Sequence, residues 1–152
     1  MLRHALATLA YRAGKPLRDA PADFSAFTLS SGTRTAGQIL AHMGDLMDWG
    51  ASIARGAQTW TNSPVHAWDA DVRRFFESVA AFDAALTATT LDDKTANMLL
   101  QGPIADALQH TGQLTMMRRL AGAPIRGENY YVADIAAGRV GPEQAAPKRE
   151  FD

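Results

Sequence analysis

The chain has 152 residues, of which 47% are hydrophobic and 20% charged, with a net charge of −1 and no cysteine. This length and balance predict one globular domain with a core of its own. The near-zero charge argues against nucleic acid and anionic membranes as partners. The lack of cysteine excludes disulfides, zinc–thiolate sites and thiol nucleophiles, so a metal site could use only nitrogen and oxygen ligands.

The N-terminal segment is the first predicted helix. Leucine and alanine recur at helical spacing from Leu2, and Gly14 and Pro16 are typical stop signals, so we expect the helix to end at about Ala13. The segment lacks the apolar run of a signal peptide, and no stretch of the chain approaches the ~20 apolar residues of a membrane span. These features predict a cytoplasmic protein.

The second predicted helix begins at a capping box, after a loop over residues 19–32. Thr35 carries a hydroxyl group and Gln38, three residues later, carries an amide. This pair can satisfy the free N–H groups at a helix start. We expect the helix to end at about Arg55, because Gly56 is a natural stop.

One imidazole lies on the apolar arc of this second helix. On a helical wheel His42 falls among large apolar side chains, whereas Asp45 and Asp48 fall on the opposite side. We therefore expect His42 to point inward and both aspartates to face solvent. The arc covers more than half of the circumference, which is wider than one core needs, so it also indicates a surface for a partner, as in a homodimer.

The third predicted helix starts at Ser63-Pro64, because a capping residue followed by proline suits a first helical turn. A continuous stripe of aromatic and aliphatic side chains follows as far as Leu86. Such a stripe is typical of a core and not of a cofactor site. His66 and Glu77 fall on the opposite face, so neither is assigned to a site.

The last long helix carries the polar residues around which the chain is organised. It should run to about Ala121, and Pro103 should either kink it or open its main segment. Asp106, His110 and Gln113 follow one another at i, i+4 and i+7, in the middle of an otherwise apolar arc. A carboxylate and an imidazole on a buried face are costly unless they are paired or bind a metal, so this stripe predicts a functional site.

The C-terminal region is predicted to add little to the fold. Asn129 can cap a short helix over residues 130–137, Tyr130 and Tyr131 could lie near the mouth of the pocket, and residues 142–152 form an irregular tail. Every long segment has the helical period. The sequence therefore predicts a single all-α domain over residues 1–152, a four-helix bundle with a short additional C-terminal helix.

Three inward ionisable residues could form a metal site between two helices. Asp106 and His110 can bind one ion together, and His42 would add a ligand from the neighbouring helix. Two imidazoles and one carboxylate leave coordination positions open, and they suit zinc, nickel, iron or manganese better than magnesium or calcium. Gln113 could be an outer partner or a weak ligand. The alternative is a metal-free polar cluster in which Asp106 pairs with either histidine.

Two stretches of the chain, residues 39–46 and 99–120, resemble the DinB-like superfamily of bacterial metal-binding bundles. The resemblance covers most of the chain in the same order. The family pattern has an inward histidine on the second helix, matched by His42, and a pair four residues apart on the last long helix. That pair ends in a histidine just before Gly-Gln, matched by the run His110-Thr111-Gly112-Gln113. The middle ligand of the family is usually a histidine, and Asp106 stands at that position here.

The resemblance implies an up-down-down-up arrangement of the helices, a homodimer and an enzyme-like pocket. Members of the family include thiol-cofactor-dependent transferases and a thiol-dependent isomerase. The resemblance thus implies a metal-dependent enzyme, such as a thiol-dependent transferase or a hydrolase, acting on a small molecule that the fold does not identify. The alternative is a non-catalytic dimeric bundle that binds a small ligand, which fits a chain without a recognisable nucleophile or phosphate-binding loop.

Overall fold

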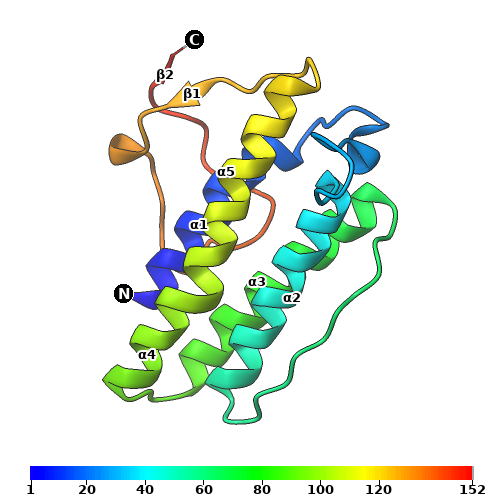
Figure 1. The fold of residues 1–152 in the computed structure, drawn as a ribbon. Helices are drawn as coiled ribbons and strands as arrows, with labels where there is room; N and C mark the ends of the chain where they lie inside the picture. Colours follow the sequence, from blue (N-terminus) through cyan, green and yellow to red (C-terminus); the bar gives the residue numbers. More distant parts are fainter. Residues whose placement is uncertain (152) are drawn as a thin grey trace.

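The computed structural model describes residues 1–151, and most of these residues are helical (Figure 1). The helices are α1 (Leu2–Leu17), α2 (Ala36–Ala54), α3 (Trp68–Ala88), α4 (Asp93–Leu99) and α5 (Ala105–Leu120), with short helical turns η1 (Phe24–Ala26), η2 (Leu100–Ile104) and η3 (Tyr130–Val132). The described residues form only two strands, β1 (Gly127–Glu128) and β2 (Glu150–Phe151), which pair antiparallel. The predicted all-α class is confirmed.

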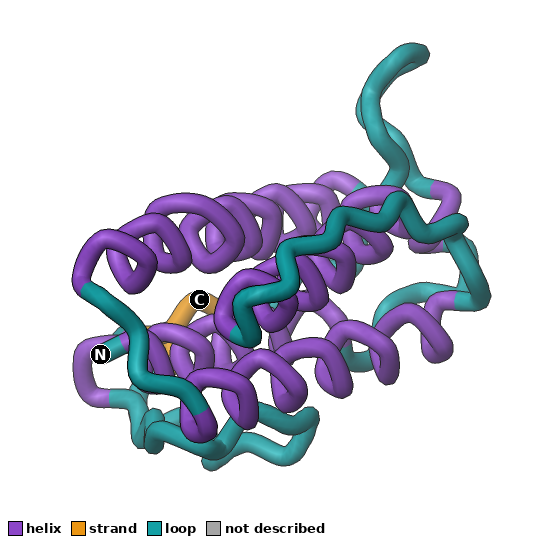
Figure 2. The backbone as a smooth tube through the Cα atoms, turned by 90° about the horizontal axis from the view of Figure 1, so that it is seen from below, coloured by secondary structure: helices purple, strands orange, loops and turns teal. Residues whose placement is uncertain are grey.

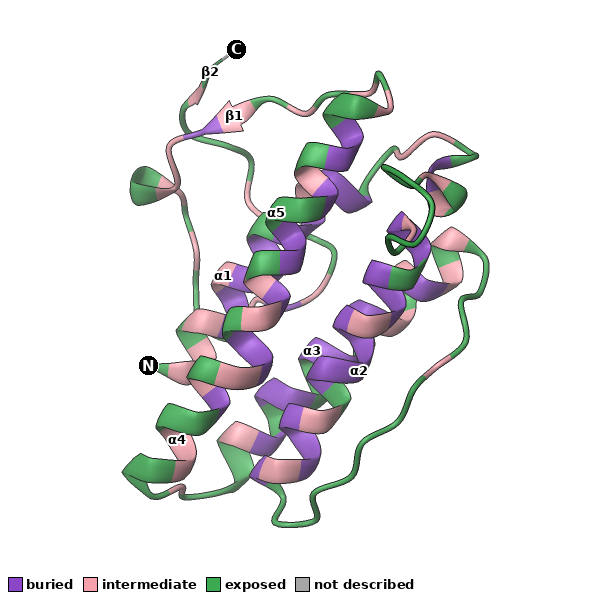
Figure 3. Ribbon diagram, in the orientation of Figure 1, coloured by how far each residue is buried: buried purple, intermediate pink, exposed green. Residues whose placement is uncertain are grey.

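The long helices pack side by side around one apolar core. Helix α2 contacts α3 and α5, and α1 contacts the same two helices from the other side. Buried positions lie on the inward faces of all four, whereas the connecting segments run over the outside (Figures 2 and 3). The largest fully buried side chains include Leu6, Leu9, Leu40, Met43, Phe75, Phe82 and Leu114. Among the described residues, no helix combines the length and the apolar character that crossing a membrane requires.

Helix α1 is longer than predicted. It continues past Ala13 and through Pro16 to Leu17, which is buried in the core. Pro16 has no N–H for the carbonyl four residues earlier, so it removes one hydrogen bond of the last turn, and the helix ends one residue later. In addition, Arg118 of α5 donates to the carbonyl of Pro16 and to two carbonyls that follow the helix. The guanidinium thus satisfies carbonyls that a helix end leaves free.

Helix α2 begins at the predicted capping box. The backbone N–H of Gln38 donates to the Thr35 hydroxyl over 3.2 Å, and the backbone N–H of Thr35 donates to the Gln38 amide oxygen over 2.9 Å. The helix ends at Ala54, with Arg55 as its cap and Gly56 at a φ of +72°. Because these signals are local, the sequence predicts both ends of this helix to within one or two residues.

Helix α3 begins at Trp68, later than Ser63-Pro64 predicts. The backbone N–H of Ser63 donates to the carboxylate of Asp45 over 3.0 Å, so this residue tethers a connecting segment to α2 and starts no helix. That segment, residues 55–67, runs along the outside of α2 and α3 from one end of the molecule to the other (Figure 1). The prediction that Asp45 faces solvent is therefore wrong, because its carboxylate is buried beneath this segment with a backbone partner.

A π-helical turn joins α4 to α5. Pro103 lies inside η2, where the chain forms a wider turn and the helix continues on both sides. Proline has no N–H group to donate and its ring collides with the carbonyl four residues earlier, and a π turn relieves both problems. Pro103 therefore lies in an irregular turn of the last long helix, and the regular segment α5 begins two residues later. Asp106 lies in the first turn after this irregularity.

The predicted helix over residues 130–137 is wrong apart from its first turn. Asn129 caps as expected, since its side-chain oxygen accepts from the backbone N–H of Tyr131 over 3.1 Å, but only the turn η3 follows. Tyr131 is 97% exposed and η3 has no buried residue. A short helix without a packed face is not stable. In the described part of the predicted tail, irregular backbone is interrupted only by β2.

Candidate metal centre

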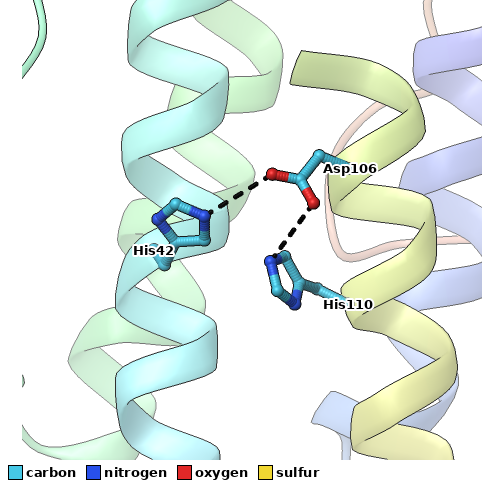
Figure 4. Close-up of side chains that lie close together, drawn as sticks. All are labelled: His42, Asp106 and His110. Carbon is cyan, nitrogen blue, oxygen red and sulfur yellow. Dashed lines mark ion pairs between the residues drawn. The ribbon is translucent and has the colours of Figure 1, made fainter. Parts of the chain in front are cut away.

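His42 of α2 and the pair Asp106 and His110 of α5 point toward one another between the two helices (Figure 4). The Nε2 atom of His42 lies 3.6 Å from Oδ2 of Asp106, and Nε2 of His110 lies 3.4 Å from Oδ1. One ligand atom from each residue lies within 4.8 Å of the other two. The predicted convergence of the three side chains is confirmed.

The spacing of these atoms is looser than direct hydrogen bonding requires, and the three ligand atoms would have to move slightly closer together to surround one ion. Hydrogen bonds between nitrogen and oxygen span about 2.7–3.2 Å, and both nitrogen–oxygen distances at this site are longer. Ligand atoms that surround a zinc-like ion at about 2.1 Å lie roughly 3.0–3.4 Å from one another. The donor set fits the metal: two imidazole nitrogens and a carboxylate are common ligands of divalent transition metals.

The site lies at the rim of the core and not inside it. The exposed fraction of the side chain is 18% for His42, 41% for Asp106 and 10% for His110. Asp106 is therefore only partly buried, less than its place on the apolar arc predicts. A carboxylate with this exposure keeps part of its hydration, so its charge costs little free energy. Burial alone therefore does not require Asp106 to have an ion or a side chain as a partner. The same exposure leaves one side of the cluster accessible to small molecules.

Gln113 fixes the orientation of the His110 ring. The Nδ1 atom of His110 lies 2.7 Å from the Gln113 amide oxygen, one helical turn away. Because an amide oxygen can only accept, Nδ1 carries the ring proton and Nε2 presents its lone pair toward Asp106. Metal-binding histidines commonly donate their second nitrogen to such an outer partner. Of the two predicted roles for Gln113, the geometry supports the outer partner.

His42 has an environment that keeps it neutral. Burial lowers the pKa of His42, the positive charge of Arg34 and the nearby His110 lower it further, and the carboxylate of Asp106 opposes these effects. The ring also packs edge-on against Trp60, with 5.8 Å between ring centroids, and against His110 at 5.0 Å. A neutral imidazole at neutral pH has the free lone pair that a metal ligand needs.

Arg74 of α3 supports the turn of α2 that carries His42. Its guanidinium donates to the backbone carbonyl of Ala41 and, over 3.1 Å, to the carboxylate of Asp45. Gly44 makes room for this contact, because a Cβ at that position would lie 2.7 Å from the guanidinium carbon. Sequence reasoning missed this arrangement, since a helical wheel places Asp45 on the polar side and cannot identify a partner on another helix.

Two pockets flank the cluster. The first has a volume of about 490 Å³ and includes His110 and Gln113 in a mainly apolar wall, with Leu29, Ile39, Met116 and Met117. The second, of about 340 Å³, includes His42 in a more polar wall, with Gln38, Asp45, Asn62 and Ser63. We call these the apolar and the polar pocket. Arg34 lines both.

The tyrosines near the C-terminus belong to neither pocket. Tyr130 packs edge-on against Tyr11 with 6.2 Å between ring centroids, and Arg12 lies over its ring. Tyr131 projects into solvent. The prediction that they lie at the mouth of the site is therefore wrong, whereas Arg34 and Trp60, which are next to the cluster, had no sequence signal beyond residue type.

No family model, curated protein or solved structure matches this chain. The resemblance to the DinB-like superfamily and the functions that it implies therefore stay predictions, and the geometry of the site carries the proposals that follow.

Proposed function

We propose that this chain is a DinB-like metal-dependent enzyme, in which His42, Asp106 and His110 hold a divalent transition metal beside a small-molecule pocket. The observation that carries the proposal is the convergence of two imidazole nitrogens and a carboxylate from two helices, at one accessible point. Zinc, nickel, iron and manganese are the candidates, because each accepts mixed nitrogen and oxygen ligands.

The residues of the site have separate tasks in this proposal. A bound divalent metal lowers the pKa of a water or thiol that it binds, which supplies a nucleophile at neutral pH. Gln113 holds the His110 ring with its Nε2 lone pair toward the site. Asp106 brings a negative charge where the resembling family usually has a neutral histidine. That charge favours the harder ions of the candidate set, manganese and iron, over an all-histidine site.

The reaction we propose is a thiol-dependent transfer or a hydrolysis of a small molecule in the cytoplasm. The chain contains no cysteine, so any thiol has to come from a cofactor. The alternative is a non-catalytic protein that binds a small ligand. The mainly apolar wall of the pocket beside His110 favours this alternative, since it can hold a ligand without any chemistry.

We also propose an up-down-down-up bundle that forms a homodimer. The segment 55–67 supports the topology, since a long crossover is what two neighbouring helices of the same direction need. The proposal of a dimer rests on the family resemblance alone. The wide apolar arc of α2 does not support it, because most residues of α2 are already buried within the monomer. Light scattering at micromolar concentration measures the oligomeric state directly.

The test of the metal site is elemental analysis of protein purified without an affinity tag. We expect close to one ion per chain, and a large loss in His110→Ala. His4→Ala is the matched control, because His4 is an exposed histidine of α1 away from the site. Folded wild-type protein that takes up no zinc, nickel, iron or manganese under metal excess would refute the metal site and the enzyme with it.

A further inference from the structure

We propose that the site binds a small organic monoanion with an apolar arm, such as a carboxylate, whose negative group pairs with Arg34 and whose arm fills the apolar pocket. The inference rests on the proposed function for its place beside the metal, but the charge pairing with Arg34 does not depend on a bound metal. It names the class of molecule that the site takes.

Arg34 is the cation of this site. It is exposed, precedes the cap of α2 and lines both pockets, one of which reaches His42 and the other His110. Within residues 1–151, its guanidinium has no hydrogen bond and no ion pair. The wall of the apolar pocket contains no carboxylate. The charge of Arg34 is therefore available to a ligand at the junction of the two pockets.

The apolar pocket suits the arm of such a ligand. Ile39 and Met117 form buried parts of its wall, while Leu29 and Met116 are more than half exposed at its edge. Its volume of about 490 Å³ lies in the range of small-molecule sites, which is roughly 300–1,000 Å³. Methionine side chains adapt their shape to different apolar ligands. A ligand that covered the exposed Leu29 and Met116 would gain from removing apolar surface from water.

The charge of the site selects a monoanion. A single guanidinium can bind both oxygens of a carboxylate through two parallel hydrogen bonds. Apart from Arg34 and the two histidines, Asp45 is the ionisable residue that lines these pockets. Its carboxylate is already bound by Arg74 and by the backbone N–H of Ser63, so it does not compete for Arg34. One guanidinium neutralises a monoanion completely, whereas a phosphate dianion beside it would keep one uncompensated negative charge. The pairing also places the charged end of the ligand next to the metal-binding cluster.

The experiment compares 4-phenylbutyrate with its uncharged isostere 4-phenylbutyramide. Binding to the full chain is followed by calorimetry, on protein as purified and after treatment with a chelator. In the chelated protein we expect the acid to bind about tenfold more tightly than the amide, the size of effect given by a charge-assisted hydrogen bond at a partly exposed site. Because the metal is removed, coordination of the carboxylate by an ion cannot produce this preference.

Arg34→Gln should abolish the preference for the acid while the amide binds as before. Arg55→Gln is the matched control, since Arg55 is an exposed arginine at the opposite end of the same helix and lines neither pocket. Equal binding of acid and amide by the wild-type protein, no binding of either, or a preference that survives in Arg34→Gln would each overturn the inference.

The metal content of the same proteins separates this inference from the proposed function. Arg34→Gln should hold as much metal as the wild-type protein, because Arg34 is not a ligand. A wild-type protein that prefers the acid but takes up no metal would refute the metal site and leave the anion site in place. A protein that takes up metal but does not distinguish the two compounds would do the reverse.

Discussion

Replacing Gly44 by alanine tests whether Arg74 holds the turn of α2 that carries His42. A Cβ at Gly44 would lie 2.7 Å from both the guanidinium carbon and Nη2 of Arg74. Packed side chains do not approach so closely, so the guanidinium has to move away. Its hydrogen bonds to the carbonyl of Ala41 and the carboxylate of Asp45 then lengthen or break.

The expected cost of Gly44→Ala is about 1–3 kcal/mol of unfolding free energy. Each hydrogen bond to a charged group contributes roughly 1.5–3 kcal/mol, and part of two such bonds is lost. Alanine is a better helix former than glycine, which offsets about 1 kcal/mol of this loss of stability. Asp45 is 5% exposed but keeps the N–H of Ser63 as a partner, so the loss stays below that of an unpaired buried charge.

Urea denaturation followed by circular dichroism measures this cost. Gly112→Ala is the matched control, because Gly112 lies inside α5 with open space where its Cβ would be, and alanine should stabilise the helix there by up to about 1 kcal/mol. In an Arg74→Leu background, Gly44→Ala should no longer be destabilising. A Gly44→Ala protein as stable as the wild type, or an unchanged cost in that background, would refute the role assigned to Arg74.

Three further predictions concern the metal centre. Asp106→Ala should lose most bound metal, while the thermal stability of the metal-free protein should change little because Asp106 is 41% exposed. Asp106→His should retain zinc or nickel, and a folded Asp106→His protein free of metal under metal excess would contradict this. Gln113→Leu should weaken metal affinity by about 10–100-fold in a competition titration, since the His110 ring loses its outer partner, and equal affinity would exclude that role. Burial lowers the folded-state pKa of His42, so in metal-free protein its contribution to stability is present above the ordinary histidine pKa of about 6.5 and is lost as pH falls through the folded value. Urea unfolding at a series of pH values should show this decline in the free energy of unfolding, and His42→Gln should remove the decline.

The features that the sequence predicts correctly depend on local spacing. The capping box needs only Thr35 and Gln38, which are three residues apart. The meeting of Asp106 with His110 follows from their separation by four residues on one helix, and His42 is predicted to face them because its neighbours on the wheel are apolar. The candidate ligands could therefore be identified without the structure.

The features that the sequence does not predict depend on contacts between distant residues. Ser63 has the residue type of a helix cap, but its backbone bonds to Asp45 and the helix starts later. The burial of Asp45 needs Arg74 from the next helix. The position of Arg34 at the junction of two pockets results from how the loop before α2 packs near α5, and no pattern in one segment contains that information.

The π-helical turn at Pro103 sets the rotational phase between α4 and α5. Leu99 and Ile104 are five residues apart and both fully buried. One π turn places two residues at this spacing on the same face of the helix, whereas in a regular α-helix they would point about 140° apart. Deleting Pro103 itself would leave a continuous α-helix but rotate its two halves by about 100° relative to each other. The chain would then have to expose Leu99 or turn Asp106 away from His42. A change of one residue in length is therefore more harmful here than a change of residue type, although every helix would still form.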